Sequence, residues 1–116
     1  SYVLQNLSEL ISPEAIYQAG DFRREVYLQI KHSVQQEIFR VDIMATICTR
    51  LVNHLSVNDI KLTPHQIKNI QEFIKIDFMP NDLRLSLLQD LVQSPNATLK
   101  SVMADAEISM MLLRKM

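Results

Sequence analysis

The sequence predicts an all-α fold, an irregular bundle of about five to seven helices around a central buried helix, Val41–Leu55. The 116 residues include one glycine and four prolines, so few residues suit the positive φ angles of hairpin turns. Apolar side chains instead recur at the spacing of a helical face. Hydrophobic residues make up 47% of the chain, enough for one core, so we expect a single domain over residues 1–116.

Charge and cysteine content indicate which partners and which cellular compartment to expect for the chain. Twelve Lys and Arg against thirteen Asp and Glu leave a formal net charge of −1, so the chain as a whole does not attract nucleic acid or anionic lipid. Cys48 alone cannot form an internal disulfide, and no apolar run suits a signal peptide or a bilayer span. We therefore expect an intracellular, cytoplasmic protein without membrane contact. Because the chain begins at Ser1 rather than methionine, we expect either a domain excised from a longer chain or a chain from which a tag was cleaved.

The first two elements are predicted from a periodic stripe and a capping pair. Residues Tyr2–Ile11 carry apolar side chains on one helical face. Ser12 can accept a hydrogen bond from the first amides of a new helix, and Pro13 suits its first turn. This second helix, Pro13–Ala19, should stop at Gly20.

An unbroken apolar stripe covers residues 22–55, with Asp21 as the expected N-cap. The stripe is consistent with one helix of about 34 residues, although helices average only about 11 to 12. A break near Arg40 and Val41, with Asp42 capping a second helix, is the open alternative. The second half of the stripe is apolar nearly all round, which predicts that it is the central buried helix.

Three further helices follow. The clearest local signal is Thr63–Gln66, which matches a capping box with proline at the first helical position. The helix that begins there should end at Met79, before Pro80. The next helix should start at Asn81 or Asp82 with its leucines facing inward, and the last should start near residue 97.

The last helix, Ala97–Met116, has more apolar residues than one core contact can bury. Its expected inward stripe consists of Leu99, Val102, Met103, Ala106, Met110 and Leu113. Four of the six methionines lie in its last fourteen residues, and flexible methionine-rich faces are typical of adaptable binding surfaces. Burial of the whole helix in the core is the alternative. We predict a surface for a protein partner or a second copy, formed by Ile108, Met110, Met111, Leu112 and Met116.

The segment Ala97–Met116 also resembles the helix-turn-helix that opens bacterial LacI-family repressors. The matching residues are Thr98, Leu99, Val102, Ala106, Ile108 and Ser109. The resemblance implies DNA binding as the alternative function. Glu107 departs from the motif, which has a glycine in the turn, and residues 110–113 are apolar where a recognition helix presents polar side chains. The candidate basic surface for such a partner consists of Arg23, Arg24, Lys31, Arg114 and Lys115.

No motif for catalysis, metal binding or phosphate binding is found. His32, His54, His65 and Cys48 lack the spacings of metal ligands, and a single glycine provides no glycine-rich oxyanion or phosphate loop. A pair of carboxylates for acid–base chemistry stays open, because any two acidic side chains can meet in the fold. Asn96–Thr98 matches the glycosylation pattern, but we interpret it as a helix start.

We therefore predict a non-catalytic regulatory or adaptor domain that needs no cofactor and no metal. It is expected to bind a protein partner or its own copy through the apolar C-terminal helix. DNA binding is the alternative of a different class.

Overall fold

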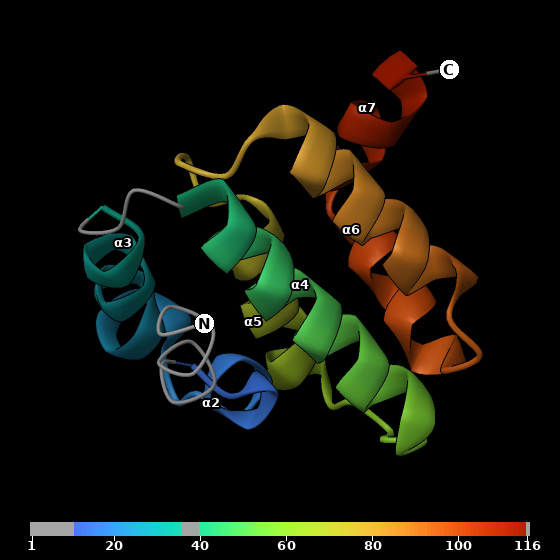
Figure 1. Cartoon of the computed structure of the whole chain (residues 1–116). Coiled ribbons are helices and arrows are strands. Elements are labelled where there is room, and N and C mark those ends of the chain that lie inside the picture. Colours follow the sequence, from blue (N-terminus) through green and yellow to red (C-terminus); the bar gives the residue numbers. More distant parts are fainter. Residues whose placement is uncertain (1–10, 36–39, 116) are drawn as a thin grey trace.

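The computed structural model describes residues 11–35 and 40–115, apart from the side chains of Arg40, Val41 and Lys115. Every regular element in these ranges is helical, which confirms the all-α prediction (Figure 1). Most of the predicted helix Tyr2–Ile11 lies outside the described residues. The elements, in chain order, are α2 (Pro13–Tyr17), the π-helix η1 (Arg23–Tyr27), α3 (Leu28–Gln35), α4 (Arg40–Val57), α5 (Pro64–Ile74), α6 (Asn81–Gln93), the 3₁₀-helix η2 (Ala97–Ala104) and α7 (Ala106–Lys115).

One cluster of buried side chains joins these elements. It contains Ile16 of α2, Leu51 of α4, Phe73 of α5 and Leu88 of α6, all with 0% of their surface exposed. Phe22, just before η1, meets the edge of the Phe73 ring at a centroid distance of 6.2 Å. Burial of each such side chain contributes about 1.5–3 kcal/mol, so this cluster is the main stabilising feature of the fold.

Two predicted N-caps are formed by the predicted side chains. The Ser12 hydroxyl accepts a hydrogen bond from the amide of Ala15 at 3.1 Å, which starts α2. The Thr63 hydroxyl accepts from the amide of Gln66 at 3.2 Å, and the Gln66 side chain accepts from the amide of Thr63 at 2.9 Å. The capping box of α5 is thereby confirmed.

The apolar stripe over residues 22–55 forms two helices that pack against each other, so the single long helix is wrong and a break between two helices is confirmed. The predicted cap is wrong, because Asp42 lies inside the first turn of α4, which begins at Arg40. Asp21 caps the first helix as predicted, because its carboxylate accepts a hydrogen bond from the amide of Arg24 at 3.2 Å. The first helix comprises η1 and α3, and α4 begins at Arg40.

The helix α4 crosses the middle of the molecule (Figure 1), but it is not buried on all sides as predicted. Ile43 and Leu51 are fully buried, whereas Thr49 and Asn53 on the other side of the helix are exposed. The neighbours α2, α3 and α6 pack on it, and they leave one strip to solvent. Asp42, Thr49 and Asn53 are seven and four residues apart on this strip, so the sequence contained a polar stripe that the interpretation overlooked.

The helix α5 ends at Ile74, five residues before the predicted end at Met79. The chain then turns so that Ile76 and Met79 enter the core, with 0% and 3% of their surfaces exposed. The guanidinium group of Arg84 donates hydrogen bonds to the carbonyl oxygens of Ile76, at 2.6 Å, and Met79, at 2.9 Å. This side chain replaces the backbone hydrogen bonds that a longer helix would have made.

A buried asparagine holds the turn before η2. The Asn96 side chain is 3% exposed and donates to the carbonyl oxygens of Leu55, at 2.9 Å, and Ile60, at 2.7 Å. Its own oxygen accepts from the amide of Thr98 at 3.1 Å, so the predicted helix start is confirmed. Asn69 similarly joins α5 to the end of α2 through two carbonyl oxygens. These amides fix the packing of segments that are distant in the sequence.

Candidate interaction surface

The predicted C-terminal helix is in fact two helices that meet at Asp105. The helix η2 ends at Ala104, and α7 begins at Ala106. A carboxylate oxygen of Asp105 accepts a hydrogen bond from the amide of Ile108 at 3.0 Å, which is the geometry of an N-cap. Aspartate is a favoured residue at this position, so a signal for the break was present in the sequence.

Because of this break, η2 and α7 do not share one inward face. In η2, Leu99 and Val102 are fully buried, as predicted. In α7, however, Met110 and Leu113 of the predicted inward stripe have 47% and 61% of their surfaces exposed. The buried residue is Ile108, which was expected off the stripe. The prediction of the buried face is therefore wrong for α7.

The residues predicted to bind a partner are divided between two sides of α7. Met110 is exposed on the outer side, and Met111 is half-buried next to it. Ile108 has 0% of its surface exposed and Leu112 packs against the core, so we remove both from the candidate surface. Met116 lies outside the described residues.

A hollow of about 270 Å³ lies between α6 and α7. Its walls are formed by Asn81, Arg84 and Leu85 of α6 and by Met111 and Arg114 of α7. Within the described part of the chain, neither arginine forms an ion pair with a carboxylate. The hollow therefore combines apolar walls with two positive charges that no carboxylate neutralises. Sequence analysis missed Arg84 and Leu85, because their place beside α7 depends on tertiary packing.

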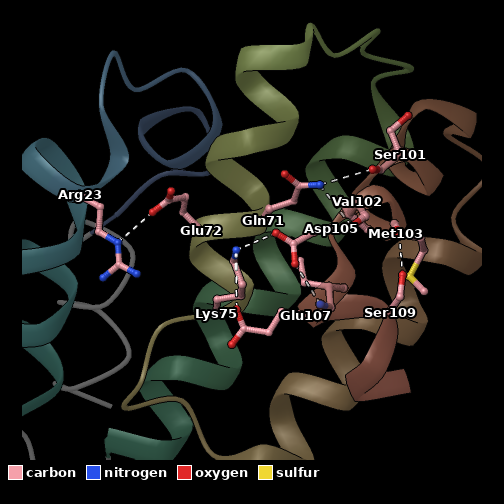
Figure 2. A network of polar contacts seen from close by, with 11 residues as sticks. Arg23, Gln71, Glu72, Lys75, Ser101, Val102, Met103, Asp105, Glu107 and Ser109 are labelled. Carbon is pink, nitrogen blue, oxygen red and sulfur yellow. Dashed lines mark hydrogen bonds and ion pairs between the residues drawn. The ribbon is translucent and has the colours of Figure 1, made fainter. Parts of the chain in front are cut away.

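A polar network holds α7 in its orientation (Figure 2). Gln71 of α5 and Lys75, the C-cap residue of that helix, face the junction of η2 and α7. Gln71 donates to the carbonyl oxygen of Val102 at 3.2 Å. The ammonium group of Lys75 lies 2.7 Å from a carboxylate oxygen of Asp105 and 3.9 Å from one of Glu107. The capping residue of α7 is thereby fixed to a buried helix.

The capping carboxylate makes the stability of this junction pH-dependent. The hydrogen bond from Lys75 is the main cause that lowers the pKa of Asp105, and the amides of Ile108 and Glu107 act in the same direction. Since the pKa in the folded state lies below that in the unfolded state, Asp105 stabilises the fold above the ordinary aspartate value of about 3.9. This contribution is lost as the pH falls through the lowered pKa of the folded state.

We expect Asp105→Asn to lower the free energy of unfolding at pH 7 by about 1 kcal/mol, because asparagine keeps the cap but loses the charge. Asp105→Ala should cost about 1 kcal/mol more, because it also loses the cap. Urea unfolding from pH 7 down to pH 2 measures both effects. At the acid end the parent and Asp105→Asn should converge, and a difference that persists there would contradict the assignment.

The cations of the predicted basic surface fall into two groups that lie apart. Arg23 pairs with Glu72 at 2.8 Å, and Arg24 lies 3.7 Å from a carboxylate oxygen of Asp21. Lys31 lies over an aromatic ring, 5.9 Å from its centroid. The other two predicted cations belong to α7, which lies on the opposite side of the molecule from α3 (Figure 1). Of these two, Arg114 is exposed, and the side chain of the other lies outside the described part.

The geometry of η2 and α7 differs from that of a helix-turn-helix. A single residue, Asp105, separates the two helices, whereas the motif has a turn of about three to four residues. The exposed side of α7 presents Glu107, Met110 and Leu113, with Arg114 as its described cation. DNA binding stays a prediction, and no contact in the described residues favours it.

The other chemical candidates of the sequence analysis are dispersed. Within residues 11–35 and 40–115, no three or more His, Cys, Asp or Glu side chains are grouped so that they could hold a metal ion. The buried polar residues there are Asn69, Ser94 and Asn96, and none of them is an acid. Burial raises the pKa of the Cys48 thiol to about 12, so this cysteine behaves as a small apolar side chain. The prediction of a non-enzyme stays a prediction.

Comparisons of the chain with protein-family models, with curated proteins and with solved structures gave no match. The helices in the described ranges include none with the length and apolar character needed to cross a membrane.

Proposed function

We propose that this chain is a non-catalytic protein-interaction domain of the regulatory or adaptor kind, which docks a protein chain on the outward side of α7. The surface consists of Ala106, Glu107, Met110, Leu113 and Arg114, and we call it the α7 outer face. The observation that carries the proposal is the exposure of Met110 and Leu113, at 47% and 61%. Grouped apolar side chains on a surface are typical of interaction sites.

The shape of the molecule supports this assignment. The helix α7 lies at one end, in contact with η2 and α6, so other elements leave its outer side accessible (Figure 1). Its inner side is anchored by Ile108 and its start is fixed by Asp105, so the outer face is presented in one orientation. A rigid surface loses little entropy on binding, which favours recognition of a partner.

The remaining exposed large apolar residues in the described part lie on other helices. Leu28 belongs to α3 and Val57 to the end of α4, with 63% and 81% of their surfaces exposed. Single exposed apolar residues are ordinary on protein surfaces. They therefore provide a matched control for the pair on α7.

We expect the double variant Met110→Ser with Leu113→Ser to lose the complexes that the parent chain forms, because it removes the apolar part of the α7 outer face. The control variant Leu28→Ser with Val57→Ser should keep them. Light scattering on the purified chain measures self-association, and affinity capture from source cells measures association with other chains. Circular dichroism checks that both variants are folded. If the α7 variant and the parent form the same complexes in both assays, the proposal is wrong.

A further inference from the structure

We infer that the occupant of the α7 outer face is a second copy of α7, paired antiparallel about a two-fold axis that passes near Met110. This inference rests on the proposed function, and it names the partner and its orientation. The order of apolar and charged residues along the exposed side of α7 supports it.

The apolar residues of the face have the spacing of a helix-pairing seam. Ala106, Met110 and Leu113 are separated by four and then three residues, and all three are exposed. This spacing keeps side chains along one line of contact between two helices. In an antiparallel pair centred on Met110, that residue meets its own copy, and Leu113 meets Ala106 of the second copy. A large residue thus packs over a small one at both ends of the seam.

The charged residues select the antiparallel orientation. Glu107 and Arg114 are seven residues apart, so they lie two turns apart on the same edge of the seam. In an antiparallel pair, Glu107 of each copy lies opposite Arg114 of the other, which gives two ion pairs related by the two-fold axis. In a parallel pair this edge of one copy lies on the opposite side of the seam from the same edge of the other copy, so Glu107 and Arg114 would not form ion pairs.

Both charged groups are available for this contact. The Glu107 side chain is 69% exposed, and it lies 3.9 Å from the ammonium group of Lys75, which is held more closely by Asp105 at 2.7 Å. Arg114 is exposed and shares the hollow with Arg84, whose described hydrogen bonds go to uncharged oxygen atoms. A carboxylate from a second copy would therefore supply the negative charge that this hollow lacks.

The size of the face sets the strength of the pair. The ten residues of α7 form a helix about 15 Å long. Two such helices bury less than the roughly 1,200 Å² at the lower end of standard interfaces. We therefore expect a dimer that forms and dissociates with concentration, rather than a permanent one.

Charge reversal in the full chain, followed by sedimentation equilibrium over a concentration series, tests the orientation. Glu107→Arg and Arg114→Glu should each weaken the dimer by about five- to thirty-fold, because each replaces two attractive pairs with two repulsive ones. The double variant Glu107→Arg with Arg114→Glu should restore the parent affinity, because it exchanges the charges and keeps them complementary. A mixture of the two single variants should form a heterodimer for the same reason.

Lys61→Glu is the control for net charge. It changes the charge of the chain as Arg114→Glu does, at an exposed position before α5, and it should leave the dimer unchanged. A dimer that is insensitive to both single reversals, or single variants that the double variant does not rescue, would overturn the antiparallel pair.

The results also separate this inference from the proposed function. If the parent is a monomer at every concentration, while Met110→Ser with Leu113→Ser loses another captured chain, the antiparallel pair is wrong and the interaction surface stands. If that apolar variant alters neither self-association nor capture, both are wrong.

Discussion

Asn96→Ala is expected to lower the free energy of unfolding by about 3–5 kcal/mol, the largest effect of any polar substitution in the described fold. The Asn96 amide donates to the buried carbonyl oxygen of Leu55 and the half-buried one of Ile60, and it caps η2 through the amide of Thr98. Each buried polar group left without a partner costs about 1–3 kcal/mol. Urea unfolding followed by circular dichroism measures the loss.

Asn53→Ala is the matched control, because Asn53 is an exposed asparagine in the middle of α4. Its replacement should change stability by no more than about 0.5 kcal/mol. Equal stability losses for the Asn53 and Asn96 variants would show that the buried amide does not hold the turn between α6 and η2.

Ile108→Ala is expected to cost about 2–5 kcal/mol, the range for truncation of a fully buried isoleucine. Ile108 has 0% of its surface exposed, and it is the one residue of α7 in the fully buried core of the described fold. Its truncation should also loosen α7, so the amides of this helix should exchange hydrogen with solvent faster than those of α5 and α6. Hydrogen exchange resolved by residue measures that difference.

Leu113→Ala is the comparison within the same helix. Leu113 is 61% exposed, so in the monomer its truncation should cost no more than about 0.5 kcal/mol. The same substitution should weaken self-association, because Leu113 lies on the α7 outer face. A large loss of monomer stability for Leu113→Ala, with none for Ile108→Ala, would mean that α7 is turned the other way.

The two sides of α7 thus have separate roles. Ile108 and Asp105 hold the helix in place, whereas Met110 and Leu113 are exposed and are the residues that we propose to bind a partner. Variants of the first pair should alter folding, and variants of the second pair should alter association. This division makes the proposed function testable without unfolding the protein.

Features that depend on neighbouring residues could be predicted from the sequence. Ser12 and Thr63 cap α2 and α5 as predicted, because a cap is a hydrogen bond between residues two or three apart. The helix α6 begins at Asn81, one of the two predicted starts, Asn81 and Asp82. Leu87, Leu88 and Leu91 of α6 are buried as predicted, since their spacing places them on one side of the helix.

Features that depend on distant residues could not be predicted. The position of Arg84 beside α7 depends on the turn between α5 and α6, whose carbonyl oxygens it binds. That turn is apolar because Ile76 and Met79 fill the core, so in the sequence it looks like a continuation of α5. The break within residues 22–55 was hard to locate for a similar reason, because apolar periodicity continues on both sides of it.

The all-helical class and the local starts of several helices follow from the sequence alone, because glycine scarcity, periodicity and capping act within a few residues of chain. The choice of the covered apolar stripe of α7 depends instead on tertiary packing. This short helix has two apolar stripes of similar hydrophobicity. One contains Ile108 and Leu112, and the other contains Met110 and Leu113. The cap at Asp105, its bond to Lys75 and the position of α6 bury the first stripe and leave the second exposed.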